Sequence, residues 1–122
     1  MKRVLLVDDE KSTGLLFEAC FKAEKGYQFN FVSGGDKCLD FLKNQKEKPD
    51  IILLDVMMPE KDGFRVCSEI RKIKKYSKIK IFMFTALNNE IVESKAKKAG
   101  ADGCIEKSLG LKSMLEKIKS LA

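Results

Sequence analysis

Five short apolar runs alternate with five amphipathic stretches along the chain, and this alternation constrains the fold more than any other feature. The apolar runs predict strands at residues 3–7, 28–32, 50–55, 79–85 and 102–106. The stretches after them predict helices at residues 11–25, 35–45, 63–75, 89–99 and 110–121. Such alternation is typical of an α/β fold with helices on both faces of a parallel sheet. At 122 residues, we expect residues 1–122 to form one domain.

Residues at the ends of the predicted helices support these boundaries. Asp62 can cap the amino end of the third helix. Gly26 and Gly100 each follow a helical stretch, at a position where a left-handed residue commonly ends a helix.

Two of the predicted helices have unusual apolar faces. The fourth has a narrow one, so we expect it to be loosely anchored and able to move. The first has a wide one, which we interpret mainly as additional core; a docking surface for a partner helix is the alternative. The apolar face of the fourth helix consists of Ile91, Val92, Ala96 and Ala99, and that of the first of Leu15, Leu16, Phe17, Ala19, Cys20, Phe21 and Ala23.

Three carboxylates follow two of the predicted strands. Asp55 ends the third strand, and Asp8 and Asp9 directly follow the first. The carboxyl ends of parallel strands share one edge of the sheet, so neighbouring strands would bring these acids together. Three charge pairs about 4 Å apart would cost roughly 12 kcal/mol at an effective dielectric near 20, which is comparable to the stability of a whole domain. The cluster must therefore be hydrated, protonated or bound to a metal.

An oxygen-only cluster with open positions suits Mg²⁺, which keeps several of its waters. The chain contains no histidine, which disfavours zinc and any nucleophile activated by an imidazole base. The sequence therefore predicts a magnesium site at this edge of the sheet.

A hydroxyl and an ammonium group are expected at the same edge, because Thr85 ends the fourth strand and Lys107 follows the fifth. With the acids they form a predicted phosphoryl-binding pocket, in which Asp55 attacks phosphorus and Lys107 neutralises a phosphoryl oxygen. Thr85 can bond to the newly attached group. Each residue alone also has an ordinary explanation, such as a helix cap or an exposed strand end.

Together these residues resemble the response-regulator receiver domain over the whole chain. The matching motifs are Val7-Asp8-Asp9-Glu10, Asp55-x-x-Met58-Pro59-x-x-Asp62-Gly63, Thr85-Ala86, and Gly100-Ala101-Asp102 leading to Lys107. The resemblance implies a flavodoxin-like, CheY-like doubly wound sheet of five parallel strands in the order 2-1-3-4-5, with five helices. It also implies a phosphoacceptor that catalyses only its own phosphorylation and dephosphorylation. Because 122 residues leave no room for a second domain, we expect a receiver without an output domain, which either stands alone or is a part of a longer regulator.

The resemblance assigns a role to each pocket residue. Asp55 accepts phosphate from a histidine kinase or a histidine phosphotransfer protein. Asp8, Asp9, Asp55 and the backbone carbonyl of Met57 bind Mg²⁺ directly or through water. Thr85 and Lys107 are the switch hydroxyl and the phosphate-contacting lysine.

Four positions depart from the usual pattern of that family. Cys104 stands where an aromatic residue usually turns inward on phosphorylation, and Ser108 stands where the family usually has a cis proline. We therefore expect a different output geometry. Met57 and Leu87 are apolar where many members carry polar groups that position the attacking water, so we expect slow self-dephosphorylation.

The distribution of charge bears on partners. Residues 1–60 carry 9 Lys and Arg against 11 Asp and Glu, whereas residues 61–122 carry 15 against 7. We interpret the basic half mainly as a solvated surface, with an acidic protein partner or a homodimer through the fourth and fifth helices as expected readouts. The lysines lack interleaved aromatics, so direct binding of nucleic acid is disfavoured.

Two further observations bear on the cellular compartment in which the protein is expected. The apolar stretch at the amino terminus is too short for a signal peptide or a membrane span, so we expect a cytoplasmic protein. The four cysteines contain no Cys-x-x-Cys pair, and we expect reduced packing residues.

Two other classes compete with a phosphorylation switch. A binding module that keeps the fold and works without phosphorylation is slightly favoured by the missing aromatic. The presence of all five pocket residues argues against it, because an acid cluster with no cation to hold would be costly. A Mg²⁺-dependent aspartyl-phosphate hydrolase requires Asp-x-Asp after the first strand, whereas here the two acids are adjacent.

Overall fold

The computed structural model describes residues 1–86 and 89–121. Its strands are β1 (Lys2–Val7), β2 (Tyr27–Val32), β3 (Ile51–Asp55), β4 (Lys80–Thr85) and β5 (Gly103–Glu106). Its helices are α1 (Lys11–Lys22), α2 (Gly35–Asn44), α3 (Gly63–Arg71), α4 (Glu90–Ala99) and α5 (Leu111–Leu121). Two 3-10 turns, η1 (Lys74–Tyr76) and η2 (Lys107–Leu109), complete the described chain.

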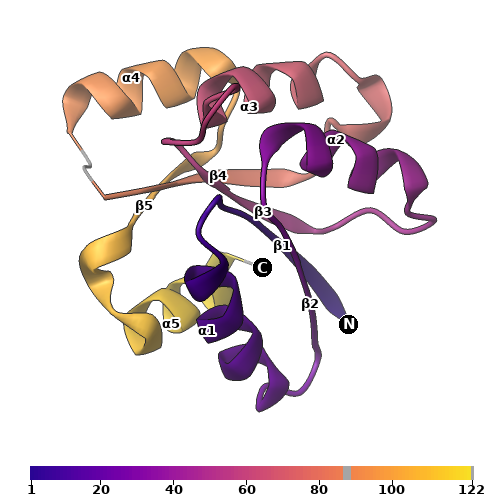
Figure 1. The fold of residues 1–122 in the computed structure, drawn as a ribbon, viewed down its shortest axis with the longest axis vertical. Helices are drawn as coiled ribbons and strands as arrows, with labels where there is room; N and C mark the ends of the chain where they lie inside the picture. Colours follow the sequence, from indigo (N-terminus) through magenta and orange to yellow (C-terminus); the bar gives the residue numbers. More distant parts are fainter. Residues whose placement is uncertain (87–88, 122) are drawn as a thin grey trace.

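The strands form one parallel sheet in the order β2-β1-β3-β4-β5, which confirms the predicted topology (Figure 1). All five residues of β3 are buried. Burying an Ile or Leu side chain contributes roughly 1.5–3 kcal/mol, so this apolar run stabilises the centre of the sheet. A strand buried on both faces reads as a continuous apolar run, which is the signal seen in the sequence.

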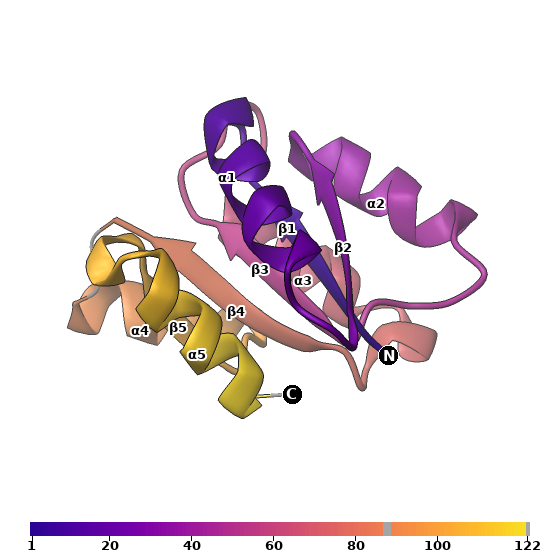
Figure 2. The same ribbon diagram turned by 90° about the horizontal axis from the view of Figure 1, so that it is seen from below.

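Helices cover both faces of the sheet, with α1 and α5 on one side and α2, α3 and α4 on the other (Figures 1 and 2). Successive side chains of a strand point to opposite faces of the sheet and pack into two separate hydrophobic cores. Leu5 and Ile52 point into the core beneath α2 to α4, whereas Leu6 and Leu53 point into the core beneath α1 and α5. Among the described residues, no helix is both long enough and apolar enough to cross a membrane.

The helix ends agree only in part with the predicted boundaries. Asp62 caps α3 as predicted, since its Oδ1 accepts the Arg65 N–H at 2.9 Å. This helix nevertheless ends at Arg71 and not at residue 75, because Ile73 has an extended backbone before η1. Gly100 ends α4 with a φ of 96°, as predicted. The first helix ends at Lys22, so the left-handed Gly26 belongs to the turn into β2.

The two unusual helix faces have different outcomes. The interpretation of the wide α1 face as core is wrong for four of its residues. Leu15 is 66% exposed and Leu16 is 53% exposed. The small side chains of Ala19 and Ala23 are exposed as well. Phe17 and Phe21 supply the buried side of α1. In α4 only Ala96 is buried, which confirms that this helix covers little of the core. The motion predicted for α4 stays a prediction.

Gly63 allows α3 to begin directly against the end of β3. A Cβ atom at this position would lie 2.2 Å from the backbone oxygen of Asp55 and 2.6 Å from the Met83 Cε. The Gly63 N–H also donates to the Val56 oxygen at 3.0 Å, which ties the start of α3 to the end of the strand. Any larger residue must displace the backbone that carries Asp55.

We predict that Gly63→Ala lowers the free energy of unfolding by about 3 kcal/mol, because overpacking here meets backbone atoms that cannot turn aside. Urea unfolding followed by circular dichroism measures the change. Gly34→Ala is the matched control: an added Cβ there meets no atom within 4 Å. Its change should be about 1 kcal/mol or less. Equal effects of the two substitutions would contradict the steric explanation.

Candidate functional site

The parallel pairing of β1 with β3 brings three carboxylates together. Val7 lies opposite Leu54 in the register, so Asp8 and Asp55 follow side by side at the carboxyl edge of the sheet. Oxygens of Asp8, Asp9 and Asp55 lie within 4.8 Å of one another. Asp8 and Asp55 are buried, at 0% and 2% exposure, whereas Asp9 is exposed. The predicted convergence of these acids is confirmed.

Lys107 lies between the two buried carboxylates. Its Nζ is 3.0 Å from Asp55 Oδ1 and 3.2 Å from Asp8 Oδ2. The same ammonium lies 5.1 Å from the centroid of the Phe84 ring, a distance at which a cation is attracted by the aromatic face. The sequence suggested hydration, protonation or a metal for the acid cluster. The structure adds an internal counter-ion, which balances part of the charge.

The surroundings shift the protonation of both partners. Burial raises the pKa of Asp55, the hydrogen bond from Lys107 lowers it, and the charge of Asp8 raises it, with a net result of about 7. Burial lowers the pKa of Lys107, but its hydrogen bond to Asp55 and the charges of Asp55 and Asp8 raise it more, so the pKa lies above its ordinary value. Without a further cation, Asp55 is thus partly protonated near neutral pH.

The residues of the cluster fit a divalent metal ion. Asp8 Oδ1 accepts the Glu10 N–H at 2.9 Å. Asp8 Oδ2 is buried and, within the described chain, meets no donor in hydrogen-bond geometry, although Lys107 lies nearby. A buried carboxylate oxygen without a hydrogen bond is costly, and coordination to a cation would satisfy it. The oxygen-only donor set is the kind that hard divalent ions prefer.

The other predicted site residues follow β3 or end β4. Thr85 is buried at the end of β4, one residue beyond Phe84, which is opposite Asp55 in the register. Met57 is the second residue after Asp55, and its side chain points away from the core with 79% exposure. Leu87 lies outside the described residues.

The contacts that hold the loop after Asp55 were not predicted from the sequence. Lys61 in this loop forms ion pairs with Asp36 of α2 at 3.0 Å and with Glu69 of α3 at 3.2 Å. Glu60 beside it has a φ of 68°, which is uncommon for a residue other than glycine. The loop is thus held between two helices, and only the charge of Lys61 could have pointed to this.

The two departures in the switch region have distinct surroundings. Cys104 is a half-buried free thiol in β5, and burial followed by the charge of Glu93 raises its pKa. It lines a groove of about 420 Å³ whose walls include Ala96 and Ala101. Ser108 belongs to the η2 turn and donates its hydroxyl to Glu106 Oε2 at 3.1 Å.

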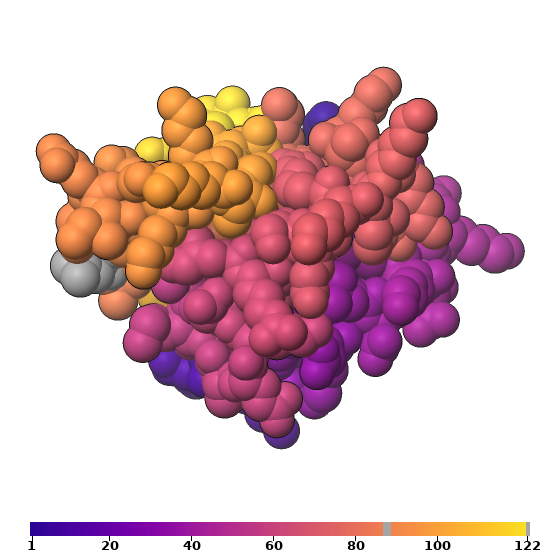
Figure 3. Space-filling model, turned by 90° about the horizontal axis from the view of Figure 1, so that it is seen from above, coloured from indigo at the N-terminus to yellow at the C-terminus, as the bar shows by residue number. Residues whose placement is uncertain are grey.

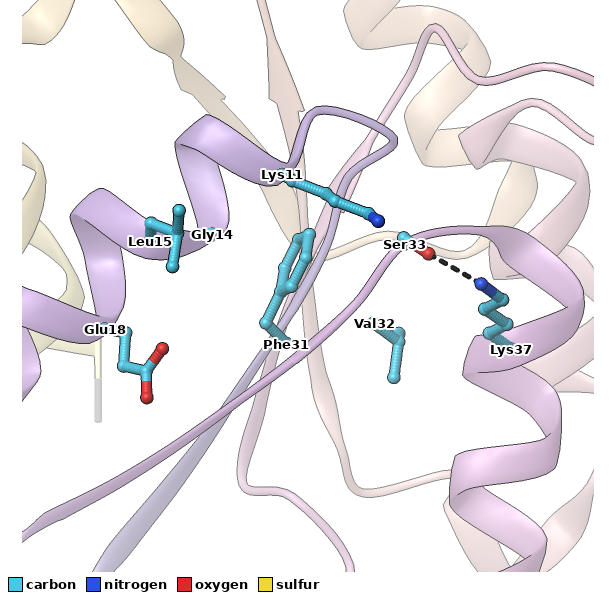
Figure 4. A pocket seen from close by; sticks show the side chains of 8 residues that line it. All are labelled: Lys11, Gly14, Leu15, Glu18, Phe31, Val32, Ser33 and Lys37. Atoms are coloured by element: carbon cyan, nitrogen blue, oxygen red, sulfur yellow. Dashed lines mark hydrogen bonds between the residues drawn. The ribbon is translucent and has the colours of Figure 1, made fainter.

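A second groove, of about 440 Å³, lies between α1, the end of β2 and α2 (Figure 4). Leu15 and Phe31 supply much of its apolar lining, and Lys37 donates to the Ser33 hydroxyl at 2.9 Å at one end. None of the three clustered acids lines this groove. It explains where the exposed Leu15 side chain lies but adds nothing to the chemistry at Asp55.

Comparison with known proteins agrees with this geometry. The protein-family model described as "Response regulator receiver domain" matches residues 4–119 of this chain. The chemotaxis protein CheY4 of Vibrio cholerae is 27% identical, with a TM-score of 0.89 over 100% of this chain and 99% of that one. The Mn²⁺-bound response regulator Rcp1 is 25% identical, with a TM-score of 0.81 over 99% and 91% of the two chains. The phosphorylated cyanobacterial phytochrome response regulator RcpA is 25% identical, with a TM-score of 0.81 over 98% and 90%.

The family match spans almost all of the chain, and the solved structures share its sheet and its five helices. The acid cluster is of the kind typical of receiver domains of two-component signalling. This chain therefore belongs to the response regulator receiver domain family.

Proposed function

We propose that Asp55 is the phosphoacceptor of a two-component or phosphorelay pathway, within a single receiver domain formed by residues 1–122. The observation that carries this proposal is the position of Lys107, whose ammonium contacts both Asp55 and Asp8 at the edge where the three acids meet. A receiver domain implies a histidine kinase as partner, and a phosphohistidine of a kinase or a phosphotransfer protein is the proposed donor.

The transfer itself needs an ionised and fixed nucleophile. A carboxylate oxygen of Asp55 attacks phosphorus in line, so that an O–P bond forms as the P–N bond of phosphohistidine breaks. The imidazole leaves with the bonding electron pair and takes up a proton. Lys107 favours the ionised form of Asp55 and offers a positive charge to the phosphoryl oxygens. Burial of β3 keeps the attacking group in place.

Mg²⁺ is the proposed cofactor, held by Asp8, Asp9, Asp55 and the backbone carbonyl of Met57. When bound, it neutralises charge on the acids and on the transferred group. The similar protein Rcp1 was observed with Mn²⁺, another divalent ion that prefers oxygen ligands. The buried Asp8 Oδ2 supports the assignment, because a cation would supply the bond that it lacks within the described chain.

Readout of the phosphorylated state is proposed to use Thr85 and the surface of α4, β5 and α5. The Thr85 hydroxyl would bond to the phosphoryl group, and Lys107 would move from the acids to a phosphoryl oxygen. An acidic downstream protein, or a second copy of this chain, is the proposed partner on that surface, where α4 contributes Lys95, Lys97 and Lys98.

A binding module that works without phosphorylation is the second candidate. Lys107 favours it, because an internal counter-ion lowers the cost of keeping the acids together in the absence of a metal. Cys104 in place of a switch aromatic favours it as well. The two candidates differ in whether Asp55 accepts a phosphoryl group.

We expect acetyl phosphate with Mg²⁺ to add one phosphoryl group to the protein, because Asp55 is the poised nucleophile. Intact-protein mass spectrometry measures the adduct. Asp55→Asn should abolish it, whereas Asp40→Asn, at an exposed position of α2, should leave it unchanged. An unmodified parent protein, or an adduct that survives in Asp55→Asn, would exclude this role for Asp55 and favour the binding module.

The raised pKa of Asp55 predicts a pH-dependent stability. The folded protein holds this proton up to about pH 7, whereas the unfolded chain releases it near 3.8, so the contribution is present at low pH and lost as pH rises through 7. The variant Asp55→Asn lacks this titration, so its free energy of unfolding should not fall in this way. In EDTA, the free energy of unfolding of Asp55→Asn minus that of the parent should therefore increase by about 2 kcal/mol between roughly pH 5.5 and 8.5.

Urea unfolding of both proteins at each pH tests this expectation. Adding Mg²⁺ at the higher pH should stabilise the parent more than Asp55→Asn, because the variant has lost one ligand. A gain that is constant with pH would contradict the assignment of the raised pKa to Asp55.

We expect slow self-dephosphorylation, with a half-life of minutes or longer, because the exposed Met57 side chain cannot orient an attacking water. Loss of the adduct over time, followed by mass spectrometry in EDTA-quenched samples, measures the rate. Met57→Asn should accelerate it roughly tenfold or more by positioning water, whereas Met57→Leu should not. A half-life of seconds in the parent protein would overturn this expectation.

A further inference from the structure

A basic groove lies at the edge of the sheet opposite the phosphoacceptor. It occupies about 360 Å³ between the start of β1, the loop before β3 and the η1 segment before β4. Five of its lining residues are basic, namely Arg3, Lys46, Lys48, Lys75 and Lys78. Figure 3 shows long side chains from the regions coloured for residues near 46 and near 75 projecting at the same end of the molecule.

Internal contacts use the two acids of the groove and two of its basic residues. Glu47 pairs with the guanidinium of Arg3, and Asp50 Oδ2 accepts the Arg3 backbone N–H at 2.8 Å. Lys48 donates to the Lys75 oxygen at 2.8 Å, which joins the two walls. These contacts fix the shape of the groove and leave neither acid to pair with its remaining lysines.

Lys46, Lys75 and Lys78 carry the unbalanced charge. Within residues 1–86 and 89–121, none of these three ammonium groups is within ion-pair distance of a carboxylate. Lys75 lies 5.3 Å from the centroid of the Tyr76 ring, which orients its stem beside the groove. Three exposed positive charges around one hollow attract an anionic ligand.

We infer that this groove binds an acidic segment of a partner protein, independently of phosphorylation. The floor includes Pro49, which is buried, and Ile79, which is 5% exposed. An apolar floor under a basic rim matches a peptide that carries acidic and apolar side chains together.

The chemistry of the lining favours a peptide over the other polyanions. Stacking of nucleic-acid bases needs exposed aromatic or arginine planes, but Tyr76 is buried and Arg3 is engaged by Glu47. A membrane surface is flat, so it meets the lysines at the rim but cannot reach the apolar residues Pro49 and Ile79 inside the groove, whereas a peptide chain can contact both.

The position of the groove explains the independence from phosphorylation. Asp50 precedes β3 and Asp55 ends it, so the two sites lie at opposite edges of a rigid, fully buried strand. At about 3.3 Å per residue they are roughly 17 Å apart, beyond a Debye length of about 8 Å at physiological salt. A phosphoryl group on Asp55 therefore changes the groove little.

The test measures binding of a fluorescein-labelled peptide, Glu-Glu-Leu-Glu-Glu-Leu-Glu-Glu, by fluorescence anisotropy at a physiological ionic strength of about 0.15 M. The triple variant Lys46→Gln, Lys75→Gln, Lys78→Gln removes the groove charges. The matched control Lys11→Gln, Lys22→Gln, Lys25→Gln removes three exposed lysines in and next to α1, away from the groove and from the α4 surface, and gives the same net charge. Thermal unfolding of both variants checks that they fold.

The groove variant should weaken binding about tenfold, because three exposed ion pairs of ordinary strength are lost, and the α1 variant should change it less than about twofold. Equal losses would overturn the inference, since they would show diffuse attraction by net charge. Tighter binding of a short DNA duplex, or of phosphatidylserine vesicles, to the groove would overturn the choice of a peptide.

Beryllofluoride with Mg²⁺ separates this inference from the proposed function. Peptide affinity should stay within about twofold when the reagent is added, because screening isolates the two edges. A larger change would overturn independence. If Asp55 failed to accept a phosphoryl group, peptide binding to the untreated protein would still test the groove.

Discussion

The parallel pairing of β1 with β3 is the constraint on which the rest of the structure depends. A crossover connection places the first and third strands side by side in the sheet, and acids lie at the carboxyl ends of both. Asp8 comes directly after β1, and Asp55 is at the end of β3. Asp8 and Asp55 therefore meet in a buried position. The fold has to neutralise this charge, and Lys107 at the end of β5 does so in part. The ends of β1 and β3 thus bring the negative charges together, and the residue after β5 supplies a positive charge.

Much of the fold was predictable, because each element depends mainly on local pattern. A fully buried strand such as β3 is a continuous apolar run, and Asp62 caps α3 through a residue three positions away. The same holds for the acid cluster, since strand ends in a parallel sheet share an edge. The interpretation of the α1 face was wrong because an apolar side chain on a helix is not necessarily buried. Leu15 and Leu16 continue the apolar face of α1, yet both side chains are exposed.

Contacts between distant segments were beyond the sequence. In the sequence Lys61 looks like any exposed lysine, yet in the structure it joins two helices through ion pairs with Asp36 and Glu69. The sequence predicted that Lys107 neutralises a phosphoryl oxygen, but it did not predict the ion pairs that Lys107 forms with Asp55 and Asp8 in the structure. Whether a lysine pairs with an acid or projects into solvent depends on tertiary distances of a few ångströms, and those are absent from a pattern of charges.

The contrast between β3 and α4 has a consequence for how the molecule can respond. All five residues of β3 are buried, whereas α4 buries a single alanine. Local opening of α4 thus exposes little apolar surface, while opening of β3 requires loss of the whole core. The amide hydrogens of the two elements will accordingly exchange with solvent on widely separated timescales. We therefore expect Asp55 to stay in place on a rigid strand, and any rearrangement to involve peripheral elements such as α4.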